Sequence, residues 1–161
     1  MVWGMIILVG AALDQLVKYL MIQNFAWSTR VPIIGNFVNF TLVMNRGAAF
    51  SMLSDPIWGP TVLKIISIVA LAVIVIAIIN FRSKRVRACL SFIAAGALGN
   101  LIDRFARGGV VDFVELRFGS WSFPVFNLAD AFITCGGAVL IFVLLVELRR
   151  ERKYRTPPKI I

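Results

Sequence analysis

The sequence lacks histidine altogether, and charged residues make up only 16% of its 161 positions. Without histidine, Ser-His-Asp triads, Cys-His pairs and His-rich zinc sites are excluded. Cysteine is scarce as well, since only Cys89 and Cys135 occur, both inside apolar segments. Thiols in such surroundings usually behave as small apolar side chains, so we assign them no chemistry.

Apolar residues are abundant instead. They make up 60% of the chain, where soluble domains have about half. An α-helix crosses a bilayer with about 20 mostly apolar residues. Four segments satisfy this condition, so we predict an all-α integral membrane protein, a single membrane domain with spans over about 2–21, 57–81, 88–105 and 126–148. The first segment has no basic start and carries two charged residues, so we interpret it as a retained helix rather than a signal peptide.

The net charge of +9 is concentrated in two basic clusters that directly flank apolar runs. Lysine and arginine placed in this way mark the cytoplasmic side of a membrane protein, which argues against nucleic acid as a partner. We therefore predict that both termini and a basic tail over 149–161 are cytoplasmic, and that the connections 22–56 and 106–125 face outward. The clusters are Arg82, Lys84, Arg85 and Arg87, and Arg149, Arg150, Arg152, Lys153, Arg155 and Lys159.

The long outer insertion over 22–56 contains a segment with period two. Val38, Phe40, Leu42 and Met44 alternate with residues that are mostly polar, and this alternation predicts a strand with one apolar face. Proline and glycine flank the segment and indicate turns. A small sheet on the outer membrane surface follows from this pattern.

Polar residues inside or beside the spans carry the functional information, because they are costly in lipid. Asp14 and Lys18 are four residues apart and share a helix face, which predicts an internal ion pair. Asn100, Asp103 and Arg104 lie in the outer half of the third span. Asp103 and Arg104 are adjacent and do not face each other, so we expect each to have a different partner.

Two further carboxylates belong to the outer side of the membrane. Asp112 falls in the outer loop after the third span, and Asp130 lies near the outer end of the fourth, three residues after Asn127. The predicted topology brings both to the same leaflet. Asn45 precedes Gly47 in a turn, where it is either a loop tip or reaches back toward this site.

Two close carboxylates without histidine, a catalytic serine motif or a metal cluster indicate aspartyl hydrolysis. Such a pair shares one proton, since both members cannot ionise cheaply. The ionised member takes a proton from water while the protonated member polarises the substrate carbonyl. Two aspartates alone suit a magnesium ion poorly, so we expect no metal and no other cofactor.

A small multi-pass transporter or channel with an outer-leaflet polar site is the main alternative, because intramembrane charges can line an ion path. The span over 57–81 is almost wholly apolar through its middle, however, and offers no continuous path. A scaffold that associates helices through polar residues would explain Asp14 and Lys18 but not Asp112 together with Asp130. An aspartyl protease that cuts within the bilayer would carry both aspartates well inside spans, whereas Asp112 falls beyond the end of the third span.

Five motifs, in order and across most of the chain, resemble those of the bacterial lipoprotein signal peptidase family, also called signal peptidase II. They are DQLVK (14–18), NRGAAF (45–50), AGALGNLIDR (95–104), VVDF (110–113) and FNLAD (126–130). Each motif alone is weak, but five in this order on a chain with four spans are specific. Two small departures are Ala95, where the family often has glycine, and Ala131, where a small hydroxyl residue is common.

The resemblance implies four transmembrane helices with a small extracytoplasmic β-cradle in the bacterial inner membrane. It implies an aspartic endopeptidase whose substrate is a diacylglyceryl-modified prolipoprotein, cut just before the lipid-bearing cysteine. Membrane lipids are the other expected partners, and we expect a monomer. The implied catalytic dyad is Asp112 and Asp130; the residues implied to line or support the site are Asn45, Asn100, Arg104 and Asn127; and the polar residues assigned a structural role are Asp14, Lys18 and Asp103.

Overall fold

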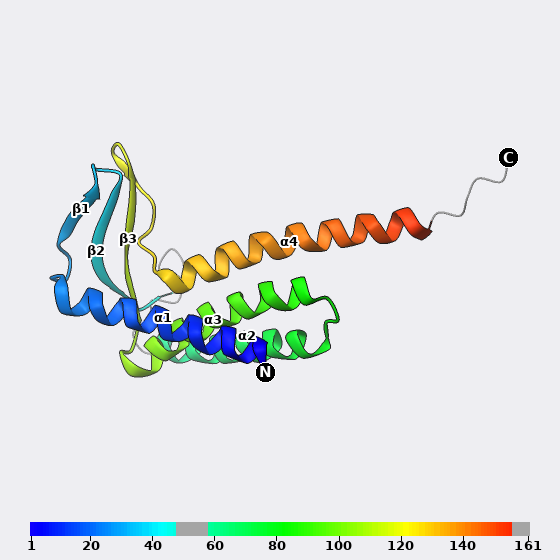
Figure 1. Ribbon diagram of the computed structural model, residues 1–161. Coiled ribbons are helices and arrows are strands. Elements are labelled where there is room, and N and C mark those ends of the chain that lie inside the picture. The colour runs from blue at the N-terminus through cyan, green and yellow to red at the C-terminus, as the bar shows by residue number, and fades with distance from the viewer. Residues whose placement is uncertain (48–57, 156–161) are drawn as a thin grey trace.

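The computed structural model describes residues 1–47 and 58–155, the last five of these as backbone only. Its elements are four helices and one small sheet (Figure 1). Parts of four predictions fall outside the described residues: the second half of the NRGAAF motif, the end of the outer insertion over 22–56, the first residue of the span over 57–81, and the end of the basic tail.

Four helices are long and apolar enough to cross a membrane: α1 (Val2–Asn24), α2 (Gly59–Asn80), α3 (Lys84–Ala106) and α4 (Leu128–Arg155). The predicted fold class is thereby confirmed. α3 begins within the basic cluster, earlier than the expected position 88, because the Ser83 side chain caps it by accepting from the backbone N–H of Val86 at 3.4 Å. α4 continues to Arg155, so the expected tail begins as helix.

The sheet has four antiparallel strands in the order β1-β2-β3-β4: β1 (Arg30–Ile34), β2 (Val38–Asn45), β3 (Val110–Phe118) and β4 (Trp121–Ser122). The strand predicted from period two is β2. The placement of Asp112 in a loop is wrong, because this residue belongs to β3. The period is obscured in VVDFVELRF, where Asp112 and Glu115 are buried along with Val111 and Phe113.

The sheet lies at one end of the helices, and the connection between α2 and α3 lies at the other (Figure 1). Where the sheet meets α1, an apolar cluster forms from Met21, Leu42, Val111 and Phe113. A second cluster joins α2 to α3 and is covered by side chains of α1 and α4; its buried members are Ile78, Val86, Leu90 and Ala94. β2 and β3 are thus fixed against the helix ends that carry the polar motifs.

Glycines let α3 approach its neighbours closely at the level of these motifs. A Cβ atom on Gly96 would lie 2.2 Å from the carbonyl oxygen of Ala129 in α4, and one on Gly99 would lie 2.5 Å from Oδ2 of Asp14 in α1. Neither contact is possible for a larger residue without moving a backbone or a buried carboxylate. The two glycines therefore set how near α1 and α4 come to the outer half of α3.

Candidate active site

Asp112 and Asp130 converge through a shared neighbour, Asn127. Asn127 Nδ2 donates to Asp112 Oδ1 at 2.6 Å. The same side chain caps α4, since its Oδ1 accepts from the backbone N–H of Asp130 at 3.0 Å, while the backbone N–H of Asn127 donates to Asp130 Oδ2 at 3.2 Å. This reciprocal arrangement is a capping box. It orients Asp130 at the first turn of α4 and joins it to Asp112.

The second oxygen of Asp112 is held by β2. Asn45 Nδ2 donates to Asp112 Oδ2 at 3.0 Å, and Asn45 Oδ1 accepts from the backbone N–H of Gly47 at 3.1 Å, which fixes the orientation of the amide. In the sheet, Asn45 pairs with Val110 and Val43 pairs with Asp112. Of the two readings of Asn45, the structure supports the one in which it reaches back to the site.

Asp130 is half-buried and is held by α3 as well as by its own helix. Asn100 Nδ2 donates to Asp130 Oδ1 at 2.8 Å. Asn100 Oδ1 in turn accepts from Asn127 Nδ2 at 3.2 Å and from Lys18 Nζ at 3.1 Å. The two donors at its oxygen leave the amide nitrogen of Asn100 directed at the carboxylate.

Asp112 is only 2% exposed, and this burial has the largest effect on the pKa of its carboxyl group. Burial raises the pKa of this carboxyl from 3.8 to about 6, and the nearby charge of Asp130 acts in the same direction. The hydrogen bonds from Asn45 and Asn127 and the charge of Lys18 lower the pKa and offset part of the effect. Asp112 is therefore able to hold a proton at mildly acidic pH, up to about 6.

Behind the dyad lies a buried cluster of charges. Lys18 Nζ is 2.8 Å from Oδ2 of Asp14 and 2.8 Å from Oδ2 of Asp103, and all three side chains are fully buried. The predicted Asp14–Lys18 ion pair is thus confirmed. Sequence reasoning missed Gln15 and Arg107, which both donate to Asp103 Oδ1. The spacing of Arg107, four residues after Asp103 on the same helix, was the available signal.

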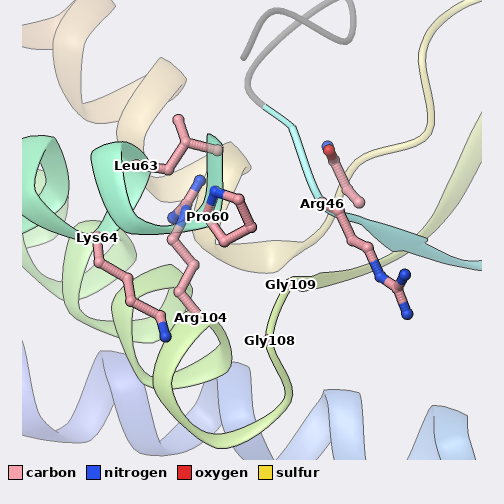
Figure 2. A pocket seen from close by; sticks show the side chains of 8 residues that line it. Arg46, Pro60, Leu63, Lys64, Arg104, Gly108 and Gly109 are labelled. Carbon is pink, nitrogen blue, oxygen red and sulfur yellow. The ribbon is translucent and has the colours of Figure 1, made fainter. Parts of the chain in front are cut away.

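Arg104 lies at the edge of the site and forms no ion pair with Asp103. Its Nη1 donates to the backbone oxygen of Asn100 at 3.3 Å, so the two neighbours have different partners, as predicted. Together with Asn45 it lines a crevice too narrow to hold water. Figure 2 shows Arg104 rising toward Pro60 at the start of α2, while Arg46 points away from it.

The two carboxylates differ from most buried acids in having only amide donors. Among the described residues, no lysine or arginine forms a salt bridge with Asp112 or Asp130. In the same part of the chain, no three acidic or cysteine side chains converge on a point where they could hold a metal ion. A pair of hydrogen-bonded carboxylates without a salt-bridge partner can act as general acid and general base toward a water molecule.

Comparison with known proteins gives a consistent set of similarities. A model of the signal peptidase (SPase) II family matches residues 6–146. The lipoprotein signal peptidase of Anaplasma phagocytophilum (strain HZ) is 40% identical over 149 residues, which cover 92% of this chain and 93% of that protein. The lipoprotein signal peptidase of Burkholderia cenocepacia (strain HI2424) is 39% identical over 155 residues, covering 95% and 91%.

Two solved bacterial membrane enzyme structures, both determined by the in meso method, share the fold. One, at 2.3 Å resolution, superposes with a TM-score of 0.82 at 30% identity and covers 99% of this chain and 94% of that one. The other, at 1.9 Å resolution, gives a TM-score of 0.79 at 33% identity and covers 89% and 92%.

Proposed function

Because the chain belongs to the signal peptidase II family, we propose that it is an aspartic endopeptidase of the bacterial inner membrane. It removes signal peptides from diacylglyceryl-modified prolipoproteins and cuts just before the lipid-bearing cysteine. The observation that carries the aspartic assignment is the Asp112–Asn127–Asp130 arrangement, in which two carboxylates share an amide neighbour and neither forms a salt bridge with any described residue.

Different surroundings give the two aspartates different tasks. Asp112 is enclosed and holds a proton up to a pKa of about 6, so it donates a hydrogen bond to the scissile carbonyl and stabilises the oxyanion. Asp130 is less enclosed and lies at the N-terminal end of α4, where the helix dipole favours negative charge. It takes the proton from the attacking water. The proton passes to the leaving amine as the tetrahedral intermediate collapses, which restores the pair.

The depth of the site suits a substrate that is anchored in the membrane. The dyad lies where the sheet meets the helices, at the end opposite the basic α2–α3 connection (Figure 1). With that connection and both termini in the cytoplasm, the site faces outward, where the cleavage point of a signal peptide emerges. The lipid and the signal helix of the substrate then bind against the apolar helices. Their binding energy holds the scissile bond close to the two carboxylates. The chain acts as a monomer and a single membrane domain.

The test is cleavage by the protein reconstituted in lipid. We expect the wild type to cut a diacylglyceryl-modified prolipoprotein and to leave the unmodified precursor intact. Asp112→Asn and Asp130→Asn are expected to lower kcat by about 1,000-fold or more, as losses of catalytic groups do. Gel mobility of the substrate and mass spectrometry of the new N-terminus report the cut and its position.

Glu115→Gln is the matched control, because it neutralises another buried acid on the same strand. It is expected to cleave like the wild type. If the wild type cuts neither substrate, the proposed function is wrong. If the wild type cuts but either asparagine variant retains full activity, the function stands and the dyad is misassigned.

A further inference from the structure

The ammonium group at the centre of the buried charge cluster uses all of its hydrogen-bonding capacity. An ammonium group has three protons to donate, and Lys18 Nζ has three partners: Asp14 and Asp103, each at 2.8 Å, and Asn100 Oδ1 at 3.1 Å. None of the three charged side chains is exposed. The ammonium therefore joins α1 to α3 at a single defined point.

Both carboxylates of this cluster also hold a backbone N–H from another element. Asp14 Oδ1 accepts from the backbone N–H of Ala129 at 2.9 Å, and Asp103 Oδ2 accepts from the backbone N–H of Val111 at 3.0 Å. Ala129 immediately precedes Asp130, and Val111 immediately precedes Asp112. Each carboxylate thus holds the peptide segment that carries one catalytic aspartate.

We infer that Asp14, Lys18 and Asp103 form a positioning device that sets the separation and orientation of the catalytic pair. This inference rests on the proposed function. Lys18 is the central member, because it bridges the two carboxylates that hold the segments bearing Asp112 and Asp130. Its third bond orients Asn100, which donates to Asp130.

Helix capping and stability alone do not account for this arrangement. Ala129 lies in the first turn of α4, so its N–H needs an acceptor and Asp14 supplies one. Capping does not explain why Asp103 accepts from the backbone of β3. It also does not explain why Asp14 and Asp103 both contact the ammonium group of Lys18. Buried ion pairs contribute little net stability compared with apolar residues of the same volume, and their best-attested role is to enforce one geometry.

A second layer keeps Asp103 in place. Its Oδ1 accepts from Gln15 Nε2 at 3.0 Å and from Arg107, and Arg107 also donates to Gln15 Oε1 at 2.8 Å. Oδ2 of Asp103 is left for Lys18 and the backbone of Val111. With both oxygens engaged, the carboxylate has no freedom to rotate away from β3.

The test compares variants that remove the same charge but differ in the backbone contact. In Asp14→Asn and Asp103→Asn, the amide oxygen still accepts from Ala129 or Val111, whereas Asp14→Leu and Asp103→Leu leave that N–H without a partner. Misplacing a catalytic group by about 1 Å can cost about 100-fold in rate. We expect kcat of each leucine variant to be about 10- to 100-fold below that of its asparagine counterpart, with KM unchanged.

Binding provides the readout that a merely structural role would not change. A lipopeptide with a hydroxyethylene group in place of the scissile bond must contact both carboxylates, so its affinity should fall with kcat. A lipopeptide with a reduced scissile amide, which depends on the lipid and signal helix, should bind as before. Equal kcat values within each pair of folded variants, or a loss carried by KM, would overturn the inference.

A second variant covers the case in which a leucine variant does not fold. Asp14→Asn combined with Lys18→Met removes the ammonium without leaving Asp14 unpaired, and keeps an acceptor for Ala129. The same drop in kcat and in hydroxyethylene affinity is expected, and unchanged values contradict the inference. Failure of the proposed function is recognised separately, because the wild type would then not cleave the lipidated substrate at all.

Discussion

Strand β3 buries two acidic side chains three residues apart and gives them opposite surroundings. Glu115, 4% exposed, accepts from Arg30 Nε at 2.6 Å, from Arg30 Nη2 at 2.9 Å and from Thr41 Oγ1 at 3.0 Å. Asp112, 2% exposed, accepts from the side-chain amides of Asn45 and Asn127 and from no other side chain in the described part of the chain. The guanidinium holds the pKa of Glu115 below its ordinary value, while burial raises the pKa of Asp112 to about 6.

The difference separates an acid with a structural task from the acid that we propose to be catalytic. A bidentate arginine keeps Glu115 ionised and joins β1 to β3, which is a structural task. Amide donors orient Asp112 equally well but do not compensate its charge, so the carboxyl can take up and release a proton. Among the described residues, no cation forms a salt bridge with Asp112, and we expect the proposed chemistry to depend on this.

Placing a cation beside Asp112 should make its surroundings resemble those of Glu115, and should have the largest effect on activity. In Asn45→Lys, the ammonium would lower the pKa of Asp112 and reduce the fraction of molecules in which it is protonated at neutral pH. We expect kcat/KM at pH 7 to fall about 100-fold, a typical contribution of general acid catalysis, and to recover partly toward acid pH. Asn45→Met, of similar length without charge, controls for bulk; equal losses in both variants would contradict the argument.

The pH profile of Asn45→Met tests the opposite change, a rise in the pKa of Asp112. The hydrogen bond from Asn45 lowers the pKa of Asp112, so its removal should raise that pKa and keep the carboxyl protonated to higher pH. The wild type should lose kcat/KM as pH rises through about 6. In Asn45→Met this alkaline limb should move upward, and in Asn45→Lys downward. Movement of both limbs in one direction would contradict the assignment.

The free energy of unfolding should depend on pH with opposite sign at the two acids. The raised pKa of Asp112 means that its contribution is fully present below about 4 and is lost as pH rises through about 6. Relative to Asp112→Asn, the wild type should lose up to about 3 kcal/mol over this range, since one pKa unit corresponds to about 1.4 kcal/mol.

For Glu115 the folded-state pKa is lowered, so its contribution is present above the ordinary value of 4.5 and is lost as pH falls through the folded value. Relative to Glu115→Gln, the wild type should therefore gain stability as pH rises through the acid range. Thermal unfolding in detergent across pH measures both differences. Two slopes of the same sign would show that the environments do not differ as described.

The sequence predicted the spans, and most of the residues that it named for a candidate site lie together in the structure, because both predictions depend on residue type and local spacing. Apolar length identified the helices, and period two in β2 placed Asn45 on its polar side. Asp130 stood out as a charge within an apolar stretch. These signals are local, and the five ordered motifs added specificity.

The remaining features depend on contacts that no local pattern carries. The strand character around Asp112 was hidden because β3 buries acids together with apolar residues. The Asp14 side chain accepts from the backbone N–H of Ala129, 115 positions away in the chain. Because every residue except proline has a backbone N–H, the residue type at position 129 does not indicate this bond. Gln15 can donate to Asp103 because Gly99 lets α1 and α3 approach closely, and the sequence does not show this approach.

The most direct test of the central claim is to detect the proton on Asp112. Infrared difference spectra between pH 5 and pH 8 report the carbonyl stretch of protonated carboxyl groups, measured on the wild type, Asp112→Asn and Glu115→Gln. We expect a band that titrates near pH 6 in the wild type and in Glu115→Gln and that is missing in Asp112→Asn. Identical spectra for the wild type and Asp112→Asn would contradict it, because the proton required for catalysis would then not reside on this residue.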